Sequence, residues 1–282
     1  MEIPFNIKNI KIDTLIGPFG KKRRRTIGLA LGGGGAKGFA HIGVLMAMEK
    51  YGLVPDIMSG VSAGSIASVL YGAGLTPGEI IECFVEAKNF GDFTEWSIPT
   101  AGVFKLDKFA KLLDSWLPVK NLEELKIPTI VCATNLTKGT QVGWRKGPIV
   151  ERVVASCSVP VIFKPVRING EYYVDGGVLH NLPAWAIRNE CEILIGSNCS
   201  PLNRSYRYKN SILDIAARSF SLSMKANTIH DMAICDYVIK PTELSDTKLF
   251  DLKALHRNMN RGYEEASVIL DTLVRDEGLD TR

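Results

Sequence analysis

The sequence predicts an α/β fold in which helices cover a largely parallel sheet. Strand-like apolar runs alternate with helix-like runs along most of the 282 residues, an order typical of parallel sheets. Hydrophobic residues make up 46% of the chain and charged residues 23%, as in ordinary globular proteins. The chain has no internal repeat, low-complexity segment or clear linker. We therefore expect one domain over 26–282, preceded by an N-terminal arm at 1–25.

The first predicted βαβ unit surrounds a run of glycines. Residues 26–32 read as a buried strand, and residues 38–51 read as a helix with apolar residues at helical spacing. The four glycines of 32–35 stand between them. A second strand at 56–62 and a helix of small residues at 63–74 complete the unit.

The rest of the chain continues this alternation. Asn169-Gly170 is a strong signal for a β-hairpin turn, and it joins two strand-like runs within 166–177. The other expected elements are helices near 77–88, 107–117, 147–160, 209–230 and 260–276, and strands at 127–136, 140–144, 192–198 and 236–241.

The positive charge of the chain is concentrated in one short run. The formal net charge is +4, and the run Lys21, Lys22, Arg23, Arg24 and Arg25 exceeds it by one, so the remainder is slightly negative. One interpretation is a solvated arm. The other is contact with anionic lipid headgroups, worth on the order of 1 kcal/mol per basic residue near such a surface. Nucleic-acid binding is not expected, because no aromatic interleaving or known motif accompanies the run.

Cysteine usage and hydropathy predict a cytoplasmic protein. The six cysteines form no CxxC pair and no metal-ligand spacing, so we expect free thiols, most of them buried, in a reducing compartment. No apolar run reaches the roughly 18 residues of a membrane-spanning helix, and the N-terminus lacks the apolar core of a signal peptide. We expect no metal and no organic cofactor.

The second predicted strand ends in the pentapeptide Gly60-Val61-Ser62-Ala63-Gly64. A G-x-S-x-G at a strand-to-helix turn is typical of a nucleophile elbow, which lifts the serine hydroxyl above the sheet edge. The alternative is an ordinary tight turn, since glycine, serine and alanine are common there. We interpret Ser62 as a nucleophile.

The glycine run admits three interpretations. The two strands of one βαβ unit end at the same edge of the sheet, so the N–H groups of Gly33, Gly34, Gly35 and Ala36 could form an oxyanion hole beside Ser62. A Walker loop requires Gly-Lys-Ser/Thr, whereas Lys37 precedes Gly38 here. A dinucleotide fingerprint requires an acidic residue at the end of the second strand, which ends at Ser62 instead. The oxyanion hole fits best.

A serine nucleophile also requires a base. His41 lies on an apolar face of the first helix, and His230 and His256 have no motif around them. His180 follows a Gly-Gly turn and stays a candidate. The better candidate is Asp175, because Gly176 and Gly177 after it allow a sharp turn that presents the carboxylate at the sheet edge. A simple Asp-Gly turn is the alternative.

The ordered set Gly33–Gly38, Gly60–Gly64 and Asp175–Gly177 resembles the patatin-like phospholipase family. The segments "FAHIGVL", "SCSVPVIFKPV" and "YYVDGGVLHNLP" also resemble bacterial members, and the resemblance covers about 26–200. It implies a three-layer α/β/α fold and a Ser62–Asp175 dyad without histidine. It also implies an oxyanion hole from the glycine loop, and phospholipase A, lysophospholipase or esterase activity, usually without calcium. Asp-Gly-Gly replaces the frequent Asp-Gly-Ala, which the family tolerates.

The expected substrate is a lipid or other carboxylic ester, cleaved through an acyl-enzyme. Candidate walls of an acyl pocket are the bulky segment 89–104, which could equally be plain packing, and the region 201–210. Two alternatives stay open: an acyltransferase with the same acyl-enzyme, and an inactive lipid-binding regulatory protein on the same fold. The sequence leaves open the head group, the acyl length, the oligomeric state and the role of the last 80 residues.

Overall fold

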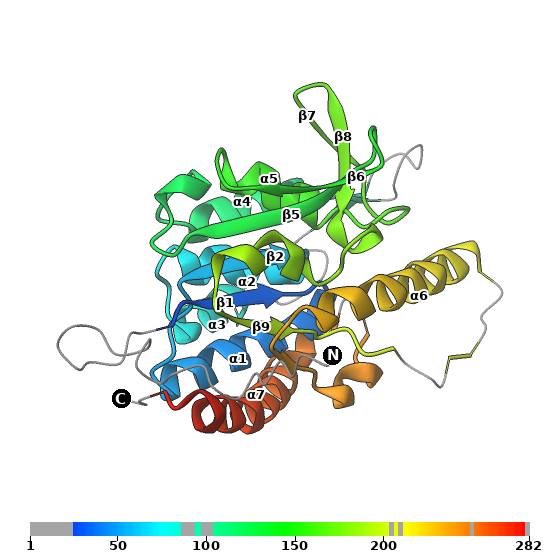
Figure 1. The fold of residues 1–282 in the computed structure, drawn as a ribbon. Helices are drawn as coiled ribbons and strands as arrows, with labels where there is room; N and C mark the ends of the chain where they lie inside the picture. The colour runs from blue at the N-terminus through cyan, green and yellow to red at the C-terminus, as the bar shows by residue number, and fades with distance from the viewer. Residues whose placement is uncertain are drawn as a thin grey trace, which may run out of the picture.

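The computed structural model describes residues 25–85, 94–96, 104–202, 206–207, 211–248 and 251–279. In these residues an eight-stranded sheet forms the centre of the protein (Figure 1). Its spatial order is β10 (Tyr237–Ile239), β9 (Ile193–Ser197), β1 (Ile27–Leu31), β2 (Ile57–Val61), β5 (Thr129–Asn135), β8 (Glu171–Asp175) and β7 (Val166–Ile168), with β6 (Thr140–Trp144) paired to β5. A separate short pair joins β3 (Glu95–Trp96) and β4 (Phe104–Lys105).

The sheet is mainly parallel, as predicted. All pairings among β10, β9, β1, β2 and β5 are parallel. The pairings that involve β6, β7 and β8 are antiparallel. Asn169 and Gly170 both have positive φ angles, 50° and 86°, as a type I′ turn requires, and they join β7 to β8. The hairpin prediction is therefore confirmed.

Helices cover one face of the sheet, and short turns with part of one helix cover the other. Leu29 and Leu31 point into the larger core, while Ala30 between them belongs to the second, because side chains alternate along a strand. The larger core is formed with α1 (Phe39–Lys50), α2 (Ala63–Gly72), α3 (Pro77–Val85), α4 (Asp107–Trp116), α5 (Ile149–Ser156) and α7 (Leu255–Glu277). The second is closed by the 3₁₀ turns Pro183–Ala186 and Arg188–Glu190 and the end of α6 (Ile212–Ala233). The first turns of α6 extend away from the sheet (Figure 1).

Two predicted helices have different bounds in the structure. The helix expected within 147–160, with Pro148 near its start and Pro160 past its end, is the shorter α5, which ends at Ser156; Pro160 disfavours helical conformation at the residue before it. The chain then bends so that the Ser158 carbonyl accepts the Asp175 N–H at 2.9 Å. The helix expected over 260–276 begins earlier, at Leu255. The 3₁₀ turns were not predicted, since their short local bonds leave no periodic sequence pattern.

Several predictions concern residues outside the described part of the chain. These are the arm at 1–24 with most of its basic run, residues 86–88, most of the proposed pocket segment 89–104, and 203–205 and 208–210 within the other one. Arg25 is described, and its guanidinium forms an ion pair with Glu277 of α7. One cation of the basic run is therefore engaged within the fold.

All six cysteines are free thiols, and four of them are buried, in agreement with the sequence analysis. The described ranges contain no helix with the length and apolar character that a membrane crossing requires.

Candidate active site

Strands β2 and β8 end face to face along one edge of β5. β2 runs parallel to β5 as far as Val61, which lies opposite Cys132. β8 runs in the opposite direction along the same edge and ends with Asp175 opposite Ala133, while β6 occupies the other edge. The end of β8 and the residue that follows β2 must therefore meet. This topology brings together Asp175 and Ser62, which are far apart in the sequence.

Ser62 occupies a strained corner between β2 and α2. Its φ and ψ angles are 52° and −124°, a region that residues other than glycine rarely adopt. The Ser62 N–H donates to Oγ of Ser156 at 2.8 Å, and the Ser156 hydroxyl donates to the Cys132 carbonyl at 2.6 Å. The Ser62 carbonyl accepts the N–H of Ser65 at 2.9 Å in the first turn of α2. The strand–turn–helix context expected around Ser62 is therefore present.

Asp175 is a buried carboxylate whose hydrogen-bond partners are neutral. It is 2% exposed, and its Oδ1 accepts the Gly177 N–H at 2.8 Å. Burial raises the pKa of Asp175 to about 6, although hydrogen bonds from the Ser62 hydroxyl and the Gly177 N–H partly offset this rise. No lysine, arginine or histidine of the described chain forms an ion pair with it. The carboxylate is thus a stronger base than an exposed aspartate.

The glycines that flank Ser62 lie so close to neighbouring backbone atoms that a side chain at either position would not fit. A Cβ on Gly64 would lie 2.1 Å from the Leu31 carbonyl oxygen, and one on Gly60 would lie 2.5 Å from the Gly64 carbonyl oxygen. The elbow is therefore packed directly against the end of β1. The remaining motif glycines are close to the same strand ends: Gly38 faces Ala63, Gly176 faces Val61, and Gly177 faces Asp175.

The glycine loop after β1 lies beside Ser62, as predicted. A Cβ on Gly33 would lie 3.2 Å from the Ser62 Cβ. The Gly33 N–H, however, donates to the Asn181 carbonyl at 3.0 Å, so it is already engaged. The N–H groups of Gly34, Gly35 and Ala36 have no acceptor among the described residues. Of the four residues expected to form an oxyanion hole, these three could offer a free donor.

His41 supports this loop from behind. It is fully buried, its Nε2 donates to the Gly32 carbonyl at 2.8 Å, and its Nδ1 lies 2.9 Å from the Ser197 hydroxyl. Burial lowers the pKa of His41 to about 4, although the bond to Gly32 opposes this. The ring is therefore neutral at physiological pH, and the contacts agree with the structural role expected for His41.

The other histidines lie away from the serine. His180 pairs with Asp231, with Nδ1 at 3.0 Å from Oδ1, and His230 and His256 are exposed. No histidine lines the cavity that contains Ser62 and Asp175 among the described residues. The structure therefore places an aspartate, and no histidine, next to Ser62.

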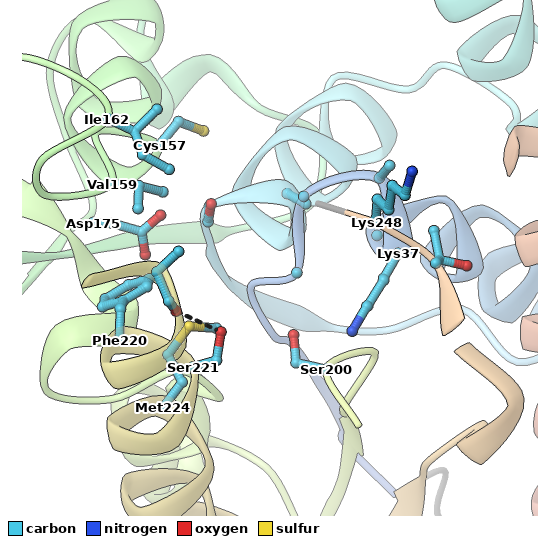
Figure 2. A pocket seen from close by; sticks show the side chains of 18 of the residues that line it. Lys37, Cys157, Val159, Ile162, Asp175, Ser200, Phe220, Ser221, Met224 and Lys248 are labelled. Atoms are coloured by element: carbon cyan, nitrogen blue, oxygen red, sulfur yellow. Dashed lines mark hydrogen bonds between the residues drawn. The ribbon is translucent and has the colours of Figure 1, made fainter. Parts of the chain in front are cut away.

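Ser62 and Asp175 open into a cavity of about 420 Å³, within the range of small-molecule sites. Its walls are mostly apolar and include Ile66, Phe84, Phe109, Val159, Phe220 and Met224. Figure 2 shows Asp175 beside Val159 and Ile162, with Phe220 and Met224 of α6 reaching toward it. Val161 at the rim has a φ of 71° and is 47% exposed, an unusual conformation for a β-branched residue. The cavity could hold an acyl chain against the serine.

Lys37 is a cation on the opposite wall from Asp175 (Figure 2). Its Nζ donates to the Pro201 carbonyl at 3.2 Å, and burial lowers its pKa, while Cys199 and Asp246 oppose this shift. From the sequence, Lys37 is expected only to support the glycine motif. Its position in the cavity follows from the 3₁₀ turn Gly35–Gly38, which directs this side chain out of the loop.

Two asparagines that the sequence analysis did not single out connect the parts of the site. Asn181 is fully buried, and its Nδ2 donates to the Gly33 carbonyl at 3.3 Å. Asn227 of α6 accepts the Asn181 N–H at 3.1 Å and donates to the Gly177 carbonyl at 2.9 Å. The signal for Asn181 is a polar residue inside the apolar run "VLHNLPAW". Asn227 lies in a polar helical stretch and gives no such signal.

Cys157 also lies beside the pair. Burial raises the pKa of its thiol, and the Asp175 charge acts in the same direction, whereas bonds with Ser65 and Ser62 oppose the shift. The thiol therefore stays protonated. Within the described ranges, no group of three histidine, cysteine or acidic side chains could hold a metal ion.

Comparison with known proteins agrees with this architecture. An uncharacterized NTE family protein of Mycobacterium tuberculosis is 32% identical over 164 residues, which cover 57% of this chain and 28% of the relative. The lysophospholipase NTE1 of Meyerozyma guilliermondii is 30% identical over 176 residues, which cover 56% of this chain and 11% of the relative. The chain therefore spans less than a third of the length of either relative.

A solved structure shares the fold. VipD from Legionella pneumophila superposes with a TM-score of 0.52 over 91% of this chain and 69% of that chain, at 16% sequence identity. The sequence pattern of the family described as patatin-like phospholipase matches residues 29–187, more than half of the chain. The chain belongs to the patatin-like phospholipase family.

Proposed function

We propose that this chain is a serine acyl hydrolase that cleaves carboxylic esters of lipids, with Ser62 as nucleophile and Asp175 as base. One observation carries the proposal. A conformationally strained serine and a buried carboxylate whose pKa is raised to about 6 meet at the wall of one apolar cavity. An activated nucleophile requires a base within hydrogen-bond reach, and a base is most effective with a pKa near the working pH.

In this mechanism the Ser62 oxygen attacks the ester carbonyl while its proton moves to Asp175. The negative charge that develops on the carbonyl oxygen is stabilised by N–H groups of Gly34, Gly35 and Ala36, which have no other acceptor in the described chain. Asp175 then protonates the leaving alcohol. In the second half it takes a proton from water, which attacks the acyl-enzyme, and it then returns that proton to the departing Ser62 oxygen as the acid is released.

The cavity supports a lipid-type ester as substrate. Its apolar lining suits an acyl chain, and its volume of about 420 Å³ exceeds that needed for a short acetyl group. The name of one relative, a lysophospholipase, supports the choice of a phospholipid or lysophospholipid, and Lys37 on the facing wall could accept an anionic group. We therefore propose phospholipase A or lysophospholipase activity, with a simple esterase as the coarser description.

Covalent labelling with a fluorophosphonate probe tests the proposal. Intact mass spectrometry should show one adduct on the wild type and none on Ser62→Ala. Ser221→Ala is the matched control, because Ser221 lines the same cavity but, among the described residues, its hydroxyl donates to the Ala217 carbonyl within α6. It should label like the wild type. A p-nitrophenyl ester series run alongside would rank acyl lengths. Labelling of Ser62→Ala, or no adduct on a folded wild type, would overturn the assignment.

A further inference from the structure

The outer face of α6 carries a stripe of exposed side chains that the active site does not use. The stripe comprises Ile212, Ile215, Ser219, Leu222, Ala226 and Ile229, all of them exposed. Its four large members are strongly exposed: Ile212 by 85%, Ile215 by 46%, Leu222 by 47% and Ile229 by 56%. The spacing between successive members is three, four, three, four and three residues. This 3-4 alternation is the a/d pattern of a helix that packs along another helix.

The opposite face of α6 is already occupied by the protein. Phe220 and Met224 line the cavity, as Figure 2 shows, and Asn227 donates to the Gly177 carbonyl at 2.9 Å. Asp231 is 2% exposed and pairs with His180. The helix is therefore fixed by its inner face, and its apolar stripe is left toward solvent along a length of about 26 Å.

The order of large and small residues in the stripe is self-complementary when one copy is reversed. In an antiparallel pair centred between Ser219 and Leu222, Ile212 faces the second copy's Ile229. Ile215 then faces the second copy's Ala226, and Leu222 faces the second copy's Ser219. Each small residue, Ser219 or Ala226, thus lies opposite a large residue of the second copy, as close packing requires. In a parallel pair each residue faces itself, so the Ser219 and Ala226 layers would leave voids.

We propose that the chain forms a two-fold symmetric dimer in which the outer stripe of α6 packs antiparallel against the same stripe of a second copy. A self-complementary patch is what a two-fold interface requires, because the same surface serves both subunits. The dimer goes beyond the proposed hydrolase function and does not depend on it. The dimer interface would also lie on α6, the helix whose inner face forms one wall of the cavity.

A membrane surface fits the stripe less well. Helices that lie in a membrane interface carry Trp, Phe or Leu on the apolar face and a charged face toward water. The stripe has no aromatic residue, and two of its six positions are the small residues Ser219 and Ala226. The inner face of α6 is packed on the protein. Steric matching between two copies is therefore the better explanation.

Sedimentation equilibrium of the full chain tests the dimer. The wild type should dimerise, and Leu222→Glu should raise the dissociation constant at least about 100-fold, because it places a charge from each copy in the centre of the seam. Val268→Glu is the matched control, since Val268 is an apolar residue on α7 that is more exposed (64%) than Leu222 (47%). It should dimerise like the wild type. Ile212→Glu, at the most exposed position, provides a second variant should Leu222→Glu fail to fold.

Cross-linking then tests the direction of the helices. In a mixture of Ile212→Cys and Ile229→Cys chains, mild oxidation should give mainly the mixed disulfide, because these positions face each other only in the antiparallel pair. Ile212→Cys alone should cross-link poorly. A monomeric wild type at tens of micromolar, an unchanged dimer in both glutamate variants, or dominant Ile212→Cys self-linking would overturn the proposal. So would monomers that bind anionic vesicles through Leu222.

Discussion

The two strand ends that meet at the candidate site differ in where their unfavourable energy lies. At the end of β2, Ser62 has a strained backbone, with φ at 52°, and an ordinary neutral side chain. At the end of β8, Asp175 has an unstrained backbone, with φ at −47° and ψ at 133°, but its carboxylate is 2% exposed. One corner stores conformational strain, and the other stores the free energy of desolvating a charge.

Because the two costs differ in kind, different substitutions should change the backbone strain at Ser62 and the desolvation cost at Asp175. Backbone strain of this kind is worth about 1–3 kcal/mol and is insensitive to pH. The cost of the buried carboxylate depends on its protonation and therefore on pH. The corners can thus be distinguished by stability measurements as well as by activity.

The largest effect should come from closing the space behind the serine corner. Gly64→Ala would place a Cβ 2.1 Å from the Leu31 carbonyl oxygen, and neither of the two backbones can move without breaking the β1–β2 pairing. We expect a loss of roughly 4 kcal/mol or more in the free energy of unfolding, measured by urea denaturation. Gly78→Ala is the control: its nearest neighbour would be 3.9 Å away in the helix α3, so it should be neutral or stabilising by up to about 1 kcal/mol. Equal effects of the two variants would contradict the close approach of the strand ends.

The next effect concerns the aspartate corner. The folded pKa of Asp175, about 6, lies above the unfolded value near 4. The folded state therefore holds this proton more tightly, so the contribution of Asp175 to stability is most favourable below pH ~4 and is lost as pH rises through ~6. Asp175→Asn removes this loss. The variant should be more stable than the wild type at pH 8 by an amount on the order of 3 kcal/mol, with a difference that shrinks toward pH 4, although it hydrolyses no ester.

Chemical denaturation of both proteins at pH 4, 6 and 8 measures this difference. A variant that is less stable than the wild type at pH 8 would show that the carboxylate is favourably bound, contrary to its raised pKa.

Much of this site could be predicted from the sequence, because its parts follow strand ends. Ser62 and the glycine loop occupy turns of one βαβ unit, and local patterns indicate both. The Gly176-Gly177 turn indicates Asp175 as the base, and the resemblance to the family implies the same pair. The route by which the two residues meet could not be predicted, since β8 pairs antiparallel with β5 and no local pattern reveals which edge it joins. The engagement of the Gly33 N–H by the Asn181 carbonyl could not be predicted, because it depends on a loop remote in sequence.

The C-terminal region was the least predictable. Its helices were expected, but their contribution to the site was not. Asn258 of α7 donates to the Ala36 carbonyl at 3.0 Å, and Asn227 of α6 holds the Gly177 carbonyl. Such single side-chain bonds between distant elements leave no periodic or compositional pattern.

The pH dependence of hydrolysis tests whether Asp175 is the base. If Asp175 is the base, kcat/KM should be constant above pH ~6 and fall about tenfold per pH unit below it, since the raised pKa governs the fraction of active carboxylate. Product release from a neutral ester, followed by chromatography between pH 4 and 9, measures the profile. His180→Gln is the control, because His180 pairs with Asp231 outside the cavity. A midpoint that moves in this variant would point to the histidine as the titrating group.

The smallest effect should come from relieving strain at the serine corner. Ser62→Gly and Ser62→Ala both remove the nucleophile, but only glycine adopts a φ of 52° with a ψ of −124° at little cost. Glycine recovers about 1–3 kcal/mol of strain and loses roughly 0.5–1 kcal/mol because it orders a more flexible unfolded chain. Ser62→Gly should therefore be more stable than Ser62→Ala by on the order of 1 kcal/mol, at pH 5 and pH 8 alike. A difference that changes with pH would place the strain in the contact with Asp175 rather than in the backbone of Ser62.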